Sequence, residues 1–493
     1  MNICERVFDH AVKQPDSIAV SLDKSKITYH ELAKKISQVS NLLRNNKHAA
    51  RTSVALLMGN EVETLEIFLG AAHAGWTAAP LDTKWSQREL LSIIDHVRPD
   101  VIFVHVKYLH QLRELTYCPE IIVCGSGAAD LSPNLKYKEQ LDSQPFLQVK
   151  PAANPHAPFY LGFTSGTTGM PKGFLRSHLS WVESFRVWNE EMNWSPEDAF
   201  YVPGPLVHSL FLFAALHAVH TGAQCILERT FHADKSIQNI KTKKISAFYA
   251  VPTMLEAIRR VNPDLHDICL QKIISSGAKT DTGTEQWWTK AAPETEWIEF
   301  YGASELSFVS LLRKQNKTGE ASLGIPFSNV DTFVQREDGT EAAPGDIGEL
   351  FVRSPMVFSG YFGEAAEAEE WLSAGDLVRQ DERGFLYLAG RKKNMIVSGG
   401  LNVYPEEVEH MLKTHEAVSE AIVFGRRDEY WGEAVSAVVT SEIPEEKLIP
   451  ELEAFCRKKL SLYKCPKQWH VLEQIPLTTS GKPARTKVIE SLN

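Results

Sequence analysis

The stretch that decides the fold reads Tyr160-Leu-Gly-Phe-Thr-Ser-Gly-Thr-Thr-Gly-Met-Pro-Lys-Gly173. Its glycines let the backbone adopt positive φ and approach a ligand closely. Four hydroxyl side chains stand beside backbone N–H groups as further donors: Thr164, Ser165, Thr167 and Thr168. Lys172 adds a single positive charge of the kind that meets phosphate. Small, donor-rich and singly cationic loops wrap triphosphates, so this stretch predicts a nucleotide phosphate loop rather than a plain surface loop.

The residues around this loop predict an α/β fold. Between about 50 and 270, apolar runs at 53–58, 101–104, 120–124 and 273–274 alternate with helical patterns such as 61–74. Strands that alternate with helices favour parallel sheets covered on both faces. After about 320, turns separate short β-like segments, which indicates a small antiparallel barrel or sheet. Helix–strand units resume from about 394, with helices at 405–413 and 447–460 and strands at 421–425 and 433–440.

Composition narrows the functional classes. The chain has 493 residues, enough for roughly three core-sized units. Its net charge of -10 argues against a general nucleic-acid binder, which needs a basic face. Seven cysteines without a CxxC pair fit a reducing compartment better than a disulfide framework or a zinc site. The first residues lack the apolar region of a signal peptide, so a cytoplasmic location is expected.

One stretch raises the question of a membrane span. Residues 209–227 contain no Lys, Arg, Asp or Glu. They do contain His217, His220, Gly222 and Gln224, and no cationic cluster or aromatic belt flanks them. The length barely reaches a spanning helix. We therefore expect a buried core helix that runs into a strand, and no transmembrane segment.

The phosphate loop resembles the signature of the adenylate-forming superfamily, which includes acyl-CoA synthetases, adenylation domains of peptide synthetases and firefly luciferase. Further motifs of that superfamily are matched in the same order along nearly the whole chain, most like those of an acyl-CoA synthetase (fatty-acid–CoA ligase). These matches lie at 27–32, 71–81, 204–209, 301–305, 374–376, 390–391, 398–400, 403–408 and 479–482.

This resemblance implies a two-domain enzyme. Residues 1–391 would form a large N-terminal domain of two parallel-sheet α/β subdomains plus a small β-barrel, with the ATP and acyl pockets. Residues 392–394 would be a hinge centred on Lys393. Residues 395–493 would form a smaller, mobile α+β domain with the catalytic lysine, Lys482, and the face for the coenzyme A step. A mobile domain suits two half-reactions that need different groups at one centre.

The resemblance also assigns the ATP site. Lys172 would hold the β- and γ-phosphates, Glu305 would ligate Mg²⁺, and Lys482 would reach the α-phosphate and the substrate carboxylate. Tyr301 would stack on adenine opposite Gly277 and Ala278, and Asp376 and Arg391 would contact the ribose. The complete implied set for ATP or AMP is Thr164, Ser165, Gly166, Thr167, Thr168, Gly169, Lys172, Gly277, Ala278, Lys279, Tyr301, Gly302, Ala303, Ser304, Asp376, Arg391 and Lys482. The implied catalytic residues are Lys482, Glu305, His208 and Thr164.

The second step has an implied coenzyme A face. Gly399 and Gly400 lack side chains and would leave a channel for pantetheine. Trp431 and Tyr463 would stack on the adenine of coenzyme A, and Lys464 would meet its phosphate. A carrier-protein phosphopantetheine presents the same arm, so a free-standing enzyme that loads a carrier protein stays open, as does a non-catalytic nucleotide- or acyl-binding protein on the same fold.

The acyl pocket is implied at Trp181, His208, Ser209, Phe211 and Leu212. Residues 207–213 contain no acid. A buried unpaired ammonium is costly, so this stretch argues against amino acids and for an apolar monocarboxylate. His208 either polarises the carboxylate, gates the pocket or is an ordinary core histidine. The expected partners are ATP, Mg²⁺, coenzyme A and a small carboxylic acid, with a homodimer possible.

Overall fold

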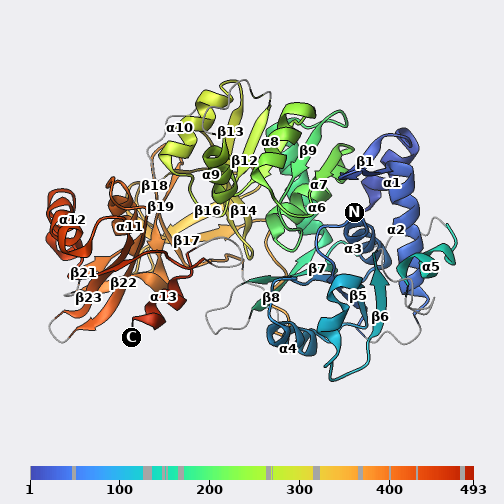
Figure 1. Ribbon diagram of the computed structural model, residues 1–493, viewed down its shortest axis with the longest axis horizontal. Helices are drawn as coiled ribbons and strands as arrows, with labels where there is room; N and C mark the ends of the chain where they lie inside the picture. Colours follow the sequence, from blue (N-terminus) through green and yellow to red (C-terminus); the bar gives the residue numbers. More distant parts are fainter. Residues whose placement is uncertain are drawn as a thin grey trace. The chain divides into compact units, whose positions relative to one another are not determined.

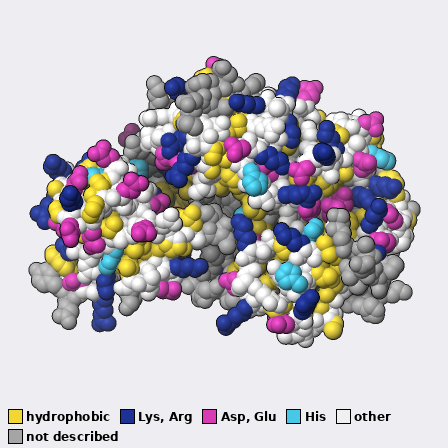
Figure 2. Space-filling view, viewed as in Figure 1, with side chains coloured by type: hydrophobic (Ala, Val, Ile, Leu, Met, Phe, Trp, Pro, Cys, Tyr) yellow, Lys and Arg dark blue, Asp and Glu magenta, His cyan; other side chains and the backbone are white. Residues whose placement is uncertain are grey.

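The computed structural model describes residues 2–46, 51–125, 136–146, 150, 154–164, 171–262, 268, 270–314, 322–364, 370–398, 401–428, 431–477 and 483–492. They form two compact units, drawn in Figure 1. The large unit comprises Met1–Lys317, Phe327–Val330 and Arg353–Glu370. The small unit comprises Thr318–Pro326, Asp331–Val352 and Trp371–Asn493. Figure 2 shows Lys and Arg side chains interspersed with Asp and Glu over the visible face.

The large unit contains one predominantly parallel series of strands in the order β14-β13-β12-β11-β9-β10-β1-β2. All neighbours from β13 to β1 are parallel, and the end pairs β13–β14 and β1–β2 are antiparallel. The strands are β1 (Ile18–Leu22), β2 (Ser25–Thr28), β9 (Ala199–Val202), β10 (Gln224–Leu227), β11 (Ala247–Ala250), β12 (Lys272–Ser275), β13 (Glu296–Ala303) and β14 (Ser307–Arg313).

A second sheet of the large unit has the order β6-β5-β3-β4-β7-β8. Its strands are parallel except for the last pair, β7–β8. They are β3 (Ser53–Leu57), β4 (Thr77–Pro80), β5 (Val101–His105), β6 (Glu120–Cys124), β7 (Pro158–Thr164) and β8 (Lys172–Ser177). The helices of the large unit are α1 (Glu5–Lys13), α2 (Tyr29–Arg44), α3 (Val62–Ala74), α4 (Gln87–Val97), α5 (Tyr137–Asp142), α6 (His178–Met192), α7 (Ser209–Thr221), α8 (Ala233–Thr242), α9 (Pro252–Val261) and α10 (Thr282–Ala291).

The predicted strands near 53, 101, 120 and 273 and the helix near 61 are confirmed as β3, β5, β6, β12 and α3. The uncharged stretch is also as predicted, since α7 is buried and leads into β10. Gly222, at φ 94°, ends α7, because a left-handed residue stops a helix without a Cβ penalty. Among the described residues, no helix is long and apolar enough to cross a membrane.

The small unit has two sheets. One runs in the order β16-β17-β18-β19-β15, and its recorded pairs β17–β18, β18–β19 and β15–β19 are antiparallel. Its strands are β15 (Ser322–Pro326), β16 (Asp331–Gln335), β17 (Ile347–Arg353), β18 (Asp376–Gln380) and β19 (Leu386–Arg391). The antiparallel pairing predicted for this region is therefore confirmed. This sheet groups with the C-terminal residues in one compact unit, although the sequence places it in the N-terminal domain.

The second sheet of the small unit has the order β21-β20-β23-β22, with β24 paired to β23. Its strands are β20 (Ile396–Ser398), β21 (Leu401–Val403), β22 (Glu420–Asp428), β23 (Gly432–Thr440) and β24 (Gln468–Leu472), and the helices are α11 (Pro405–Lys413), α12 (Glu445–Lys459) and α13 (Arg485–Ser491). The predicted strands near 421 and 433 and helices near 405 and 447 are confirmed. The domain boundary at 392–394 stays a prediction, because compactness does not report hinge motion.

A buried carboxyl group on α3 makes the stability of the large unit depend on pH. Glu66 is 5% exposed and accepts a hydrogen bond of 2.8 Å from the Tyr137 hydroxyl on α5. Burial raises the pKa of Glu66 from 4.5 to about 7. The folded state therefore favours the protonated carboxyl, and its stability falls as pH rises from 4.5 through about 7.

Replacing Glu66 by Gln removes this pH dependence and keeps an acceptor for Tyr137. We expect Glu66→Gln to gain stability relative to the parent protein as pH rises, by up to roughly 3 kcal/mol at pH 8. Tm measured for both proteins at pH 5 and pH 8 tests this. A Tm difference that is the same at both pH values would contradict it.

Candidate active site

The described ends of the predicted phosphate loop are held by strand pairing. Thr164 ends β7 and Lys172 begins β8, and the two residues face each other across the antiparallel pair. The Thr164 hydroxyl donates to the Lys172 carbonyl oxygen at 3.4 Å. The predicted residues Ser165, Gly166, Thr167, Thr168 and Gly169 lie outside the described residues. The ladder therefore sets where the loop leaves and re-enters the sheet.

Lys172 and Glu305, the predicted phosphate and magnesium ligands, meet on one tyrosine. The Lys172 ammonium lies 3.4 Å from the centroid of the Tyr361 ring. The Tyr361 hydroxyl donates to Oε1 of Glu305 at 2.7 Å. Lys172 also forms an ion pair of 3.0 Å with Glu364. Burial, followed by the hydrogen bond to Glu305, raises the pKa of Tyr361, so this hydroxyl stays a donor.

Tyr361 and Glu364 were not among the predicted site residues. Their segment reaches the site because it pairs with β8: the N–H of Ser359 donates to the carbonyl of Leu175 at 2.8 Å, and the N–H of Leu175 donates to that of Gly360 at 3.0 Å. No motif in the sequence joins this segment to a strand so much earlier in the chain. The only local sign is a short Gly-Tyr pair, which is typical of many loops.

A buried arginine joins the strand that follows Glu305 to the segment that contains Met356. Arg176, on β8, donates to the Ser307 hydroxyl at 3.1 Å and to the Met356 carbonyl at 2.7 Å. Burial lowers its pKa to about 10, which still leaves the guanidinium charged at neutral pH. The N–H of Phe358 also donates to the carbonyl of Glu305 at 2.9 Å. Glu305 is thus held by its own main chain as well as by Tyr361.

The predicted adenine contacts gather at the carboxyl ends of two parallel strands. β12 and β13 are neighbours, with Ser275 in register with Glu299. The Ser276 hydroxyl donates to the Phe300 carbonyl at 2.9 Å, which ties the loop after β12 to the residue before Tyr301. Gly277 in that loop has φ 94°, a conformation that favours glycine. The other predicted residues of this edge directly follow Gly277 or Tyr301 in the chain: Ala278, Lys279, Gly302, Ala303 and Ser304.

The predicted ribose contacts form an ion pair in the small unit. Asp376 and Arg391 face each other across β18 and β19. The Arg391 Nε lies 2.9 Å from Oδ1 of Asp376, a side chain that is 3% exposed. Lys393 follows in a short 3₁₀ turn, Lys392–Asn394, and Lys392 is held by Glu349 at 2.7 Å. The hinge role of Lys393 stays a prediction.

The predicted coenzyme A residues also belong to the small unit. Lys464 is paired with Glu407 at 2.7 Å, and Tyr463 packs against the hydrophobic core of this unit. The Trp431 ring carries a cation that was not predicted, because Lys467 Nζ lies 4.1 Å from its centroid. Gly399, Gly400 and Lys482 lie outside the described residues.

The predicted acyl residues divide into two half-buried residues at the start of α7 and three buried ones. His208 is the residue before α7 and makes no side-chain capping hydrogen bond, and Ser209 shares a hydrogen bond of 3.1 Å with the Tyr160 hydroxyl. The buried residues are at most 3% exposed: Trp181, Phe211 and Leu212. Burial lowers the pKa of His208, Asp82 opposes that shift and Lys84 adds to it. Asp82 and Lys84 were not predicted. A lowered pKa leaves His208 mainly neutral at neutral pH.

The described residues contain no group of three or more His, Cys, Asp or Glu side chains that could hold a metal ion. Glu305 is a single carboxylate. Mg²⁺ is commonly bound by one or two carboxylates together with substrate phosphates rather than by a cage of protein ligands. The donor set therefore fits a magnesium ion that arrives with a nucleotide.

Solved structures identify the fold. The o-succinylbenzoate-CoA synthetase of Bacillus subtilis in complex with an acyl-adenylate superposes with a TM-score of 0.85 at 23% identity, covering 98% of this chain and 97% of that one. The ATP-bound MatB of Rhodopseudomonas palustris gives 0.88 at 24% identity, covering 100% and 99%. The fold is that of the adenylate-forming enzymes.

Sequence comparisons give the family. The profile described as AMP-binding enzyme matches residues 7–362, and that of the AMP-binding enzyme C-terminal domain matches residues 407–482. An uncharacterized acyl–CoA ligase of Bacillus subtilis is 36% identical over 491 residues, with 99% of this chain and 98% of the relative covered. A putative long chain fatty acid-CoA ligase of Staphylococcus aureus is 30% identical over the same length and coverage. The chain belongs to the AMP-binding enzyme family, within the adenylate-forming acyl-CoA synthetases.

The hydrogen bond from Tyr361 to Glu305 should affect how tightly the enzyme binds Mg²⁺. If Glu305 is the magnesium ligand, Tyr361→Phe removes the hydrogen bond that orients it and keeps the ring beneath Lys172. Loss of a partner that orients a metal ligand typically costs 10–100-fold in metal affinity. We expect the Mg²⁺ concentration for half-maximal ATP binding, followed by titration calorimetry, to rise on the order of tenfold.

The chain offers a matched control. Tyr387 likewise donates its hydroxyl to a carboxylate, Asp381, at 3.0 Å and carries Arg379 4.0 Å from its ring centroid. Tyr387→Phe should leave the Mg²⁺ dependence unchanged. Equal behaviour of the two variants would remove Tyr361 from the metal site.

Proposed function

We propose that this enzyme uses ATP and Mg²⁺ to convert a carboxylic acid into an acyl-adenylate with release of pyrophosphate. The acyl group is then transferred to coenzyme A, giving acyl-CoA and AMP. The observation that carries the proposal is the convergence of Lys172 and Glu305 on Tyr361 in a chain of the AMP-binding enzyme family.

Charge neutralisation is the main task of such a site. The substrate carboxylate and the α-phosphate are both anionic, so their approach requires cations and a fixed geometry. Lys172 would meet the β- and γ-phosphates after it exchanges Glu364 for them. Glu305 would hold the Mg²⁺ that arrives with ATP, and the loop at Gly277 would face Tyr301 across the adenine. Lys482 would complete adenylation, and rotation about Lys393 would then present Gly399 and Gly400 to the thiol.

The proposed acid is apolar. Support comes from the neutral His208, the absence of an acid between 207 and 213, and the aromatic wall that includes Trp181. The relatives include a putative long chain fatty acid-CoA ligase, 30% identical over 491 residues, and an indoleacetate–CoA ligase of Aromatoleum aromaticum, 28% identical over 504 residues. Fatty acids and aryl acids both have an apolar tail on one carboxylate. We propose a fatty or similar apolar monocarboxylic acid.

Free coenzyme A is the proposed acceptor. Support comes from the indole of Trp431, which carries the Lys467 cation over its ring, and from two relatives covered over 98% of their own length that are named as CoA ligases. A carrier protein docks through its own surface and has no need for an adenine platform. Loading of a carrier-protein phosphopantetheine is the second candidate, because it presents the same pantetheine arm.

Pyrophosphate release over a panel of acids, with and without coenzyme A, tests the proposal. The panel contains straight-chain fatty acids, aryl acids, a dicarboxylate and an α-amino acid. We expect release with apolar monocarboxylates and formation of the matching acyl-CoA when coenzyme A is added. Preference for the amino acid or the dicarboxylate would contradict the proposed donor, and adenylate formation without acyl-CoA would contradict the acceptor.

If free coenzyme A is the acceptor, replacing Trp431 should weaken its binding. Trp431→Ala should raise KM for coenzyme A by roughly 5- to 150-fold, because stacking of one base on an aromatic contributes about 1–3 kcal/mol. Pyrophosphate release without coenzyme A should stay near the parent rate. Trp431→Phe keeps a stacking face and serves as the matched control. If pantetheine replaces coenzyme A equally well in the parent enzyme, the carrier protein becomes the better acceptor.

A further inference from the structure

Asn60 joins three separate segments of the large unit. It follows β3, precedes α3 and is 5% exposed. Its Nδ2 donates to the carbonyl of Gly204 at 2.8 Å and to the carbonyl of Glu228 at 2.7 Å. Its Oδ1 accepts from the N–H of Leu206 at 2.8 Å. These three partners determine the orientation of the Asn60 amide. If the amide were flipped, its oxygen would face the carbonyl oxygens of Gly204 and Glu228.

The bonds to Gly204 and Leu206 hold the turn that precedes His208. The N–H of His208 donates to the carbonyl of Pro205 at 3.0 Å and closes the turn, and the His208 carbonyl then accepts from the N–H groups of Phe211 and Leu212 at 3.1 Å each. A Cβ at Gly204 would clash with the Phe211 ring, so the turn packs directly against the first residues of α7. The position of the imidazole therefore follows from that of residues 204–206.

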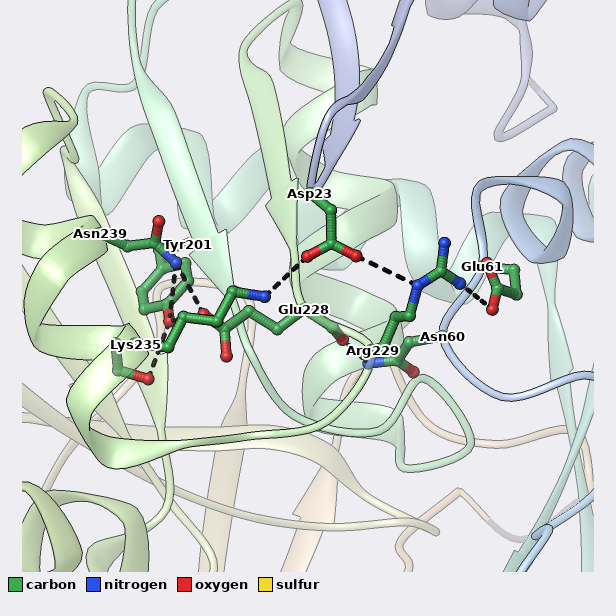
Figure 3. Close-up of polar contacts among 9 residues, drawn as sticks. Asp23, Asn60, Glu61, Tyr201, Glu228, Arg229, Lys235 and Asn239 are labelled. Atoms are coloured by element: carbon green, nitrogen blue, oxygen red, sulfur yellow. Dashed lines mark hydrogen bonds and ion pairs between the residues drawn. The ribbon is translucent and has the colours of Figure 1, made fainter.

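The third bond ties Asn60 to the main chain of Glu228, whose side chain belongs to the polar network shown in Figure 3. Glu228 is fully buried, and its Oε1 accepts from the Tyr201 hydroxyl at 2.6 Å and from Asn239 Nδ2 at 2.7 Å. Arg229 forms ion pairs with Asp23, at 3.1 Å, and with Glu61, the residue after Asn60. The frame on which Asn60 rests is thus fixed from both sides.

We propose that Asn60 is a positioning residue for acid activation. It holds the turn at 204–206, and through that turn it holds His208 and the start of α7 at the acyl end of the site. This inference rests on the proposed function. It assigns a role in the reaction to a residue outside the predicted site, from a loop of the other sheet.

The test compares two buried amides of the same network. Asn60→Ala removes the bonds to the turn, whereas Asn239→Ala removes an amide from Glu228 without touching the turn. A misplacement of about 1 Å can cost on the order of 100-fold in rate. We expect Asn60→Ala to lose kcat/KM for the acid on that scale in pyrophosphate release and to keep the parent Kd for ATP. Asn239→Ala should lose at least an order of magnitude less.

A double-mutant cycle with His208→Ala separates positioning from general destabilisation. If Asn60 acts through His208, Asn60→Ala adds little loss once His208 is already replaced, since residues that act as a unit are not additive. Asn60→Ser, whose hydroxyl can still donate or accept but is too short to span all three partners, is the variant to use if Asn60→Ala does not fold.

Failure of the positioning role can be told apart from failure of the proposed function. Additive losses in the cycle, or equal losses for the Asn60 and Asn239 variants, would overturn the positioning role and leave the proposed function standing. A parent enzyme that releases no pyrophosphate with any acid of the panel would overturn both.

Discussion

Parallel strands end at a common edge, and this constraint underlies the site of the large unit. β12 and β13 run side by side in the same direction, so the loop at Gly277 and the strand end at Tyr301 lie at one edge, where the Ser276 hydroxyl ties them together. The antiparallel pair β7–β8 does the same for Thr164 and Lys172. Ligands commonly bind at the carboxyl ends of parallel strands for this reason. The helices and hydrogen bonds around these edges hold what the strand directions bring together.

Cations predicted to meet nucleotide or coenzyme A are already paired with carboxylates of the protein. Lys172 is paired with Glu364, Arg391 with Asp376 and Lys464 with Glu407. Ion pairs open to solvent, as that of Lys172 is, contribute little to stability. Breaking the ion pair with Glu364 should therefore cost little, and the Tyr361 ring lies 3.4 Å from the Lys172 ammonium.

Burial and charge act together at His208. Burial lowers the pKa of its imidazole, Asp82 opposes that shift and Lys84 adds to it. The predicted acyl residues Trp181, Phe211 and Leu212 are buried, and Asn60 holds the turn that precedes His208. The two predicted regions thus differ in how they are held: strand pairing and an ion pair at Lys172, and the hydrogen bonds of a buried amide before His208.

The family, the α/β class and the burial of α7 could all be predicted from the sequence alone, because each is recorded in residues within a few positions of one another. The sequence also named Lys172, Glu305, Tyr301 and Asp376 as site residues. Tyr361, Glu364 and Asn60 emerged only from the tertiary structure. Their partners lie far away along the chain, on strands and turns whose proximity is set by sheet pairing, and no local spacing records a hydrogen bond between segments that meet only when the sheets form. The grouping of the β15–β19 sheet with the C-terminal residues has the same origin, since compactness is a property of contacts in space and not of motif order.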